Sequence, residues 1–231
     1  MSEAPQQRYA IIVAGGSGSR MRSALPKQFL PLRGKPVLMH TLLAWHAADQ
    51  AIRLILVLPQ AQISFWESLC REHGFTVPHE VTPGGASRFQ STACGLVRTS
   101  GDGLVAVHDG VRPFVSAAVI HACYETAAAQ GAAVASVPLK DSIREVLPGE
   151  KNAARDRSAY RIIQTPQAFR LSELKQAFEK EESPLFTDDA SVYEAWGGKI
   201  ALIEGEYSNI KITTPEDMIF AEAHIKAAQE A

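Results

Sequence analysis

Residues Tyr9 to Gln28 read YAIIVAGGSGSRMRSALPKQ, and this stretch decides the fold of the first part of the chain. The apolar run 9–13 predicts a buried β-strand, and the glycine-rich segment after it predicts a tight loop. Because glycine has no Cβ, the backbone N–H groups of such a loop can approach an anion closely. Arg20 and Lys27 follow the loop and can neutralise that anion. These features together indicate a site for a polyphosphate.

The glycine spacing differs from that of the two common phosphate-binding loops. A P-loop has four residues between its first glycine and Gly-Lys-Ser/Thr, whereas Gly15 and Gly18 lie closer together and no Lys-Ser/Thr pair follows. The dinucleotide fingerprint needs a third glycine, and Met21 stands at that position. A strand-to-helix turn without a ligand is the alternative, and the two cations favour binding.

Size and composition narrow the class of protein. The chain has 231 residues, of which 46% are hydrophobic, and a net charge of −2, which favours one α/β domain and gives no basic footprint for nucleic acid. No apolar run approaches the ~18 residues of a membrane span, and the N-terminal residues lack the apolar core of a signal peptide. We therefore expect a cytoplasmic protein that binds neither nucleic acid nor membranes. The cysteines, Cys70, Cys94 and Cys123, are far apart, which favours core positions over disulfides or zinc ligation.

Apolar runs alternate with amphipathic segments, which predicts a largely parallel sheet covered by helices. Strands are expected at 9–13, 53–58, 76–81, 104–108, 133–138 and 199–204. Helices are expected at 37–48, 63–72, 88–97, 117–130, 172–181 and 188–196. Gly74 is placed to end the second helix, and Thr214-Pro215 predicts the start of a final one.

The segment 140–161, KDSIREVLPGEKNAARDRSAYR, interrupts this alternation because it is charged and has little apolar face. Pro148-Gly149 predicts the tip of a hairpin between two short polar strands. A hairpin that buries no apolar surface is only marginally stable by itself in water. We therefore expect it to dock on another surface, such as that of a second copy of the chain, with a mobile surface hairpin as the alternative.

Polar or glycyl residues follow the predicted strands at 9–13, 76–81 and 104–108, and others lie beyond the hairpin and before the last helix. In open parallel sheets, ligands bind at the carboxyl ends of the strands. The segments concerned are 14–20, 82–88, 109–113, 164–167 and 208–213. Each also has a purely structural interpretation. Asp109 can cap a turn and pair with Arg112, His108 can be a core histidine, Arg157 a solvated arginine, Lys211 a surface lysine, and Asp188-Asp189 a helix start.

Six motifs, AGGSGSRM, PKQFLPL, HDGVRPF, DRSAYRIIQTPQAF, FTDDAS and NIKITTPEDM, occur in this order. With the Gly84-Gly85 turn they resemble the 2-C-methyl-D-erythritol 4-phosphate cytidylyltransferase family over nearly the whole chain. The resemblance implies a single three-layer α/β/α, Rossmann-like nucleotidyltransferase domain spanning 1–231. It also implies a protruding β-arm at about 140–161 that joins two subunits into a homodimer.

The resemblance further implies transfer of CMP from CTP to 2-C-methyl-D-erythritol 4-phosphate, with release of pyrophosphate, in the non-mevalonate isoprenoid pathway. Mg²⁺ is the expected cofactor, carried by the triphosphate with few protein contacts and no metal-ligating residues assigned. The implied catalytic residues are Arg20 and Lys27 at the α-phosphate, and Lys211 with a partner's Arg157 at the acceptor phosphate. The implied substrate-binding residues are Ala14, Gly15, Gly16, Gly85, Ser91 and Gly110 for the nucleotide, and Asp109, Arg112, Thr165 and Thr187 for the acceptor side.

Some positions depart from the family pattern, and two other functions stay open. Gly15 and Gly110 stand where alanines are common, and Ala86 replaces an acidic residue, which removes an expected side-chain contact to the ribose. A ribitol 5-phosphate cytidylyltransferase shares the same loop and a similar ending. A nucleotide-binding regulator without turnover is the alternative of another class, and the presence of both Arg20 and Lys27 argues against it.

Overall fold

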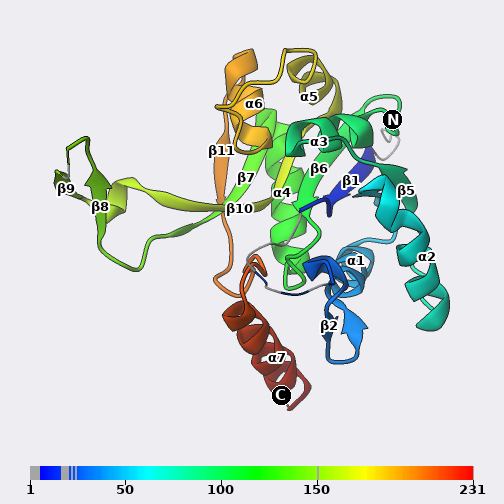
Figure 1. Cartoon of the computed structure of the whole chain (residues 1–231). Coiled ribbons are helices and arrows are strands. Elements are labelled where there is room, and N and C mark those ends of the chain that lie inside the picture. Colours follow the sequence, from blue (N-terminus) through cyan, green and yellow to red (C-terminus); the bar gives the residue numbers. More distant parts are fainter. Residues whose placement is uncertain (1–5, 17–20, 22, 24, 150, 231) are drawn as a thin grey trace.

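The computed structural model describes residues 6–16, 21, 23, 25–149 and 151–230, and a seven-stranded sheet forms its centre (Figure 1). The strands lie in the order β11-β7-β10-β6-β1-β4-β5. Their bounds are β1 Gln7–Val13, β4 Arg53–Leu58, β5 Glu80–Pro83, β6 Gly103–Asp109, β7 Ala132–Pro138, β10 Arg161–Arg170 and β11 Ala201–Glu204. Neighbouring strands are parallel except at β10, which runs antiparallel to both β6 and β7.

The connections between these strands are mostly helical. The α-helices are α1 Val37–Ala48, α2 Ile63–Glu72, α3 Arg88–Leu96, α4 Ala117–Gln130, α5 Leu171–Ala177, α6 Asp189–Trp196 and α7 Pro215–Glu230. Short 3-10 turns lie at η2 Lys27–Phe29, η3 Gln60–Gln62 and η4 Arg157–Ala159. Among the described residues, none of the helices is both long and apolar enough to cross a membrane.

The sheet is covered on both faces, because successive strand residues point to opposite sides and both sets are apolar. Ile12 of β1 belongs to a buried cluster that includes Leu38 of α1 and Tyr124 of α4. Ile11 belongs to a second cluster with side chains of α3, α5 and α6, such as Leu174. The sheet therefore lies between two helical layers, which is the expected α/β/α arrangement.

A third cluster fixes the segment 205–213, which joins β11 to α7. It contains Leu32 of β2 (Pro31–Leu32), which pairs with β3 (Lys35–Pro36), together with Val111 and Ile212. The Ile212 backbone N–H also donates to the Val111 carbonyl at 2.9 Å. These contacts hold the segment beside the carboxyl end of β6, where the candidate site lies.

A two-stranded hairpin projects from the body of the molecule (Figure 1). It consists of β8 (Ile143–Val146) paired antiparallel with β9 (Asn152–Arg155). Gly149, with a φ of 72°, lies between the two strands, in a left-handed conformation that favours glycine. The prediction of a hairpin with its tip at Pro148-Gly149 is confirmed.

Strand β10 was not predicted, and it makes the sheet mixed rather than wholly parallel. Its sequence RIIQTPQAFR contains Pro166 and the buried polar side chains of Gln164 and Gln167, which are typical of a loop rather than a central strand. The strand accommodates the proline because its pairing with β7 shifts register between Ile163 and Gln167.

Several other boundaries also differ from the sequence prediction, among them the start of β1 at Gln7 instead of Tyr9. The strand expected at 76–81 is found at Glu80–Pro83, because Pro78 interrupts the run and His79 hydrogen bonds to the Val77 carbonyl and the Trp66 indole. The helix expected at 172–181 ends at Ala177, and the glutamates that follow would be unfavourable at a helix C-terminus. The other helices begin and end within one residue of their predicted bounds, and β11 starts two residues late.

Candidate functional site

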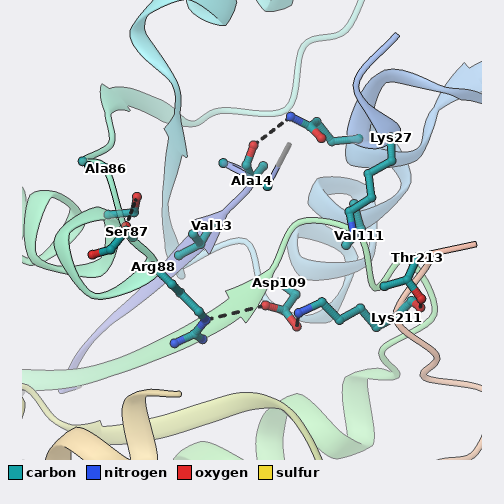
Figure 2. Close-up of a pocket in the computed structure, with 15 residues that line it drawn as sticks. Val13, Ala14, Lys27, Ala86, Ser87, Arg88, Asp109, Val111, Lys211 and Thr213 are labelled. Carbon is teal, nitrogen blue, oxygen red and sulfur yellow. Dashed lines mark hydrogen bonds and ion pairs between the residues drawn. The ribbon is translucent and has the colours of Figure 1, made fainter. Parts of the chain in front are cut away.

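A cavity of about 480 Å³ opens at the carboxyl ends of β1, β5 and β6. It is lined by Val13, Ala14, Gly15, Gly16, Lys27, Gln28, Gly85, Ala86, Ser87, Arg88, Ser91, Asp109, Val111, Lys211 and Thr213. Figure 2 shows Asp109 between two groups of residues, the start of α3 on one side and Lys27, Lys211 and Thr213 on the other. Five separate segments of the chain therefore meet in one polar hollow.

The loop after β1 is held by hydrogen bonds beneath it. Ala14 donates its N–H to the Val57 carbonyl at 3.0 Å, and its own carbonyl accepts from the Gln28 amide at 2.9 Å. Within the described part of the chain, no hydrogen-bond acceptor is found for the N–H groups of Gly15 and Gly16. The backbone at this end of β1 is thus fixed, and its glycines face the cavity.

Lys27 lies against this glycine loop, and the residue is only 8% exposed. An ideal Cβ on Gly16 would lie 3.9 Å from Lys27 Cε. Lys27 Nζ donates to the Ile212 carbonyl at 3.0 Å, which ties η2 to the segment before α7. A buried ammonium group at the edge of a glycine loop is well placed to meet an anion, because little water screens its charge.

The turn from β5 into α3 also brings backbone close to the cavity. A Cβ on Gly84 would meet Ser91 Oγ at 2.8 Å, and a Cβ on Gly85 would collide with Gln90. Ser87 caps α3 by accepting from the Gln90 N–H at 3.1 Å, and Ser91 Oγ donates to the Ser87 carbonyl at 2.8 Å. Glycine is therefore required at both positions by packing, and the N-terminus of α3 faces the cavity.

Asp109 lies at the floor of the cavity, 7% exposed, among three cations. Its Oδ2 is 3.1 Å from Lys211 Nζ and 3.2 Å from Arg112 Nε, and its Oδ1 is 3.9 Å from Arg88 Nε. Burial alone would raise the pKa of Asp109, but Lys211, then Arg88 and Arg112, outweigh it and hold the pKa well below its usual range. The carboxylate is thus ionised and fixed at any physiological pH.

His108 and Thr165 support Asp109 from below. His108 Nε2 lies 3.1 Å from the Arg112 carbonyl and therefore carries the proton, so its Nδ1 accepts from the Thr165 hydroxyl at 3.1 Å. The same hydroxyl accepts from the Asp109 N–H at 3.1 Å. Burial lowers the pKa of His108 to about 4. His108 is a hydrogen-bonded core histidine, and Thr165 is engaged on both sides.

Arg88 and Asp189 form a further ion pair beside the cavity. Arg88 Nη2 lies 2.6 Å from Asp189 Oδ2, and Asp189 Oδ1 accepts from the Thr92 hydroxyl at 2.9 Å. Asp189 is 1% exposed, whereas its neighbour Asp188 caps α6 in a capping box with Ser191. The helix-start interpretation is confirmed for Asp188, and Asp189 has the additional ion pair.

Not every candidate residue lies in the cavity. Gly110 is buried beneath it, where its N–H donates to the Val13 carbonyl at 2.9 Å and its carbonyl accepts from Thr41. Arg112 and Thr165 lie behind Asp109, and Thr187 is exposed just before α6. Arg157 is exposed at the base of the hairpin and bonds to the Lys140 carbonyl. Arg20 lies outside the described residues.

Sequence reasoning also passed over two side chains that organise the site, Gln28 and Arg88. Gln28 was quoted only as part of a motif, and nothing in its spacing marks it as the partner of the Ala14 carbonyl. Arg88 does carry a signal, because a cation in the first turn of a helix is opposed by the helix dipole. Such a residue needs a compensating anion from elsewhere in the fold.

A largely parallel sheet with glycine turns, a helix N-terminus and buried cations at the carboxyl ends of its strands is typical of α/β proteins that bind phosphorylated ligands. Further charged residues surround Asp109 at this edge of the sheet. The fold and the site are those expected of an α/β enzyme of the nucleotidyltransferase kind.

The family model of IspD, 2-C-methyl-D-erythritol 4-phosphate cytidylyltransferase, matches residues 9–227. Proteins of that name from Bacteroides fragilis and Bacteroides thetaiotaomicron are 49% and 51% identical, covering 94% and 90% of this chain and 98% and 94% of their own. The crystal structure of 4-diphosphocytidyl-2C-methyl-D-erythritol synthase from Anaerococcus prevotii has a TM-score of 0.82 at 29% identity and covers 96% of both chains. A cytidylyltransferase structure from Thermus thermophilus has a TM-score of 0.74 at 31% identity, covering 96% of this chain and 99% of that one.

The chain belongs to the 2-C-methyl-D-erythritol 4-phosphate cytidylyltransferase family. It is therefore an enzyme of the cytidylyltransferase class with an α/β nucleotidyltransferase fold. The family resemblance drawn from the six sequence motifs is confirmed.

Proposed function

We propose that the cavity is where this chain transfers CMP from CTP to 2-C-methyl-D-erythritol 4-phosphate, releasing pyrophosphate, in the non-mevalonate isoprenoid pathway. Family membership over residues 9–227 supports the reaction. The location of the reaction is supported by the cavity itself, in which two glycine turns and Lys27 face the Asp109–Lys211 pair. Since both reactants are charged metabolites, we further propose a cytoplasmic location.

The nucleotide side of the site is the loop after β1 and the turn before α3. Ala14, Gly15 and Gly16 offer backbone groups, and Gly85 with Ser91 lines the opposite wall. Gly110 acts indirectly, because a Cβ there would lie 2.8 Å from Ala14 Cβ. Ala86 contributes no polar side chain, so the ribose is held by backbone and by α3.

The chemical step is attack of an acceptor phosphate oxygen on the α-phosphorus of CTP, while the bond to the β-phosphate breaks and pyrophosphate leaves. Negative charge gathers on the α-phosphate, so catalysis depends on positioning and on fixed cations. We assign Lys27 to this charge, with Arg20 as the second residue from the family resemblance. The Lys27 bond to the Ile212 carbonyl holds its ammonium group against the glycine loop.

Mg²⁺ fits this site as part of the nucleotide complex rather than as a protein-bound ion. Among the described residues, no group of three His, Cys, Asp or Glu side chains could hold a metal. The Asp109 carboxylate, which faces the cavity, is already paired with Lys211, Arg112 and Arg88. When bound to the triphosphate, Mg²⁺ would neutralise part of its charge and keep water ligands.

The acceptor side is the group around Asp109. We propose that Lys211, 40% exposed at its side chain, binds the acceptor phosphate, and that Asp109, fixed by Arg112 and Thr165, accepts hydrogen bonds from the acceptor's hydroxyl groups. Thr187 lies at the start of α6, at the outer edge of this side.

A second copy of the chain completes the acceptor side in this proposal. Arg157 lies on the arm rather than in the cavity of its own chain. Tyr160 on the arm is 44% exposed, and Ile162 and Ile163, at the start of β10 beside the arm, are 49% and 40% exposed. Apolar side chains gathered on a projecting segment are typical of a surface that another chain covers. We propose a homodimer in which each arm presents Arg157 to the other subunit, and a single domain, 1–231, with the arm at about 140–161.

Pyrophosphate release tests the proposed reaction. The full chain is incubated with CTP and Mg²⁺, separately with 2-C-methyl-D-erythritol 4-phosphate, with ribitol 5-phosphate and with no acceptor. Release only with the methylerythritol phosphate is expected. Release only with ribitol 5-phosphate would assign the alternative acceptor, and binding of CTP without release from either would favour a regulator.

A further inference from the structure

Arg88, the first residue of α3, connects three elements around the cavity, and Figure 2 shows its contact with Asp109. Its Nε lies 3.9 Å from Asp109 Oδ1 at the end of β6, and its Nη2 lies 2.6 Å from Asp189 Oδ2 at the start of α6. Its own helix carries the wall of the nucleotide side, while Asp109 belongs to the acceptor side. One side chain therefore spans the two halves of the proposed site.

The local chemistry gives no other reason for an arginine here. The N-terminus of a helix disfavours a cation, and burying a guanidinium costs free energy that only well-placed carboxylates offset. The Arg88 side chain is 28% exposed, against 10% for Asp109 and 1% for Asp189. The arginine is thus held in an unfavourable place by two acidic residues that come from other elements.

The charge balance around Asp109, at the floor of the cavity, also depends on Arg88. Asp109 is a carboxylate in a site for two anionic reactants, and Lys211 and Arg112 face it together with Arg88. If Lys211 turns toward an acceptor phosphate, Arg112 and Arg88 remain to hold Asp109. An arginine can engage two carboxylates at once through its planar fork, whereas a lysine is a single point charge.

We propose that Arg88 is a positioning residue for the transfer reaction: it sets the separation of the nucleotide and acceptor sides and holds Asp109 in place when Lys211 binds the acceptor. The inference rests on the proposed function for the division into these two sides. Arg88 acts on the reactants indirectly, by holding Asp109 and α3 in place. Misplacement of a reactant by about 1 Å can cost roughly 100-fold in rate.

Four variants of the full chain test this: Arg88→Gln, Arg88→Lys, Asp189→Asn and the double variant Arg88→Gln/Asp189→Asn. The kcat and KM for CTP and for the polyol phosphate that the wild type accepts are measured by pyrophosphate release, alongside the Tm. Arg88→Gln is expected to lower kcat/KM for the acceptor about 100-fold, with the KM for CTP changed less than about threefold. Arg88→Lys keeps the positive charge but lacks the planar guanidinium group. Its kcat/KM for the acceptor should therefore be about tenfold higher than that of Arg88→Gln.

The double variant separates positioning from mere charge neutralisation. In the double variant no buried, unpaired carboxylate remains at position 189, so the Tm should return toward the wild-type value. The kcat/KM for the acceptor should stay low. Recovery of turnover together with the Tm would overturn the inference, as would wild-type constants in Arg88→Gln. If Arg88→Gln does not fold, Arg88→Lys decides: kcat/KM unchanged from the wild type would contradict the proposal. Absence of turnover by the wild type with methylerythritol phosphate would count against the proposed function and not against Arg88.

Discussion

The cavity and the arm hold their charged residues in opposite ways. In the cavity, Asp109 is 7% exposed and is fixed by ion pairs and by a hydrogen bond that reaches it from β10. On the arm, Arg157 is exposed, and nearby apolar side chains such as Ile162 are exposed as well. The difference indicates that packing within one chain preorganises the cavity, whereas the arm acquires its contacts from another chain in the proposed dimer.

The largest effect is expected from Lys27→Ala, which removes a cation fixed in the cavity. Loss of a group that stabilises transition-state charge costs about 100- to 1,000-fold in kcat. The Tm is expected to fall, since a buried side chain and its charge-assisted hydrogen bond to the Ile212 carbonyl, about 1.5–3 kcal/mol, are lost. The protein should nevertheless stay folded. Steady-state pyrophosphate release and thermal melting are the measurements.

Lys35→Ala is the matched control, because Lys35 is a nearby lysine that is exposed and outside the cavity lining. It should retain wild-type turnover. If Lys27→Ala unfolds the protein, Lys27 is structural, and if it leaves kcat unchanged, the cavity does not hold the α-phosphate where we assign it.

A smaller effect, about 100-fold in kcat/KM for the acceptor, is expected from Arg157→Ala, since one charge-assisted contact to the acceptor phosphate is lost. The KM for CTP should stay within about threefold, because the nucleotide side belongs to the body. Arg144→Ala, on the same arm in β8, is the control. Equal kinetic effects of the two variants would show that the arm's fold matters and Arg157 itself does not.

Exposed apolar side chains at the base of the arm, where β10 begins, predict how tightly two copies associate. Ile162→Ser removes a side chain whose burial contributes about 1.5–3 kcal/mol, so the dimer Kd should rise about 10- to 100-fold. Sedimentation over a dilution series measures it. Val97→Ser, at a residue 80% exposed beyond the end of α3, should leave the Kd unchanged. A monomeric wild type at all concentrations would contradict the dimer.

The smallest effect concerns the buried floor of the site. The folded-state pKa of His108 is lowered to about 4 by burial, so the unfolded chain takes up a proton near its usual pKa of about 6.5 while the folded chain does not. Stability should therefore fall as the pH drops from about 6.5 toward 4. In His108→Gln the Tm should depend less on pH in this window. An identical slope in both proteins would show that the imidazole is accessible to protons.

The sequence predicted the parts of the fold in which local pattern and tertiary structure agree. The helix at 37–48 and the strand at 53–58 were placed correctly because each is a continuous periodic or apolar run. Strand β10 was missed because its buried glutamines and Pro166 resemble a loop, and only pairing with β6 and β7 makes it a strand.

The same limit applies to the site. The glycine turns follow β1 and β5 directly, so the rule about strand ends leads to them. Lys27 and Lys211 lie further along the connecting segments. Arg88 and Asp189 lie 101 positions apart and meet only in the folded chain. A contact of that kind leaves no spacing pattern in the sequence. Its one sequence signal is an arginine in the first turn of a helix, where the helix dipole disfavours a cation.

The central claim, that the body and a second chain's arm share one site, is tested most directly by hybrid dimers. Lys27→Ala and Arg157→Ala chains, each with about 1% or less of wild-type activity alone, are mixed under conditions that exchange subunits. In a symmetric dimer half of the mixed population is hybrid and one of its two sites is intact, so about a quarter of wild-type activity should return. No return of activity on proven mixing would contradict a site shared between subunits.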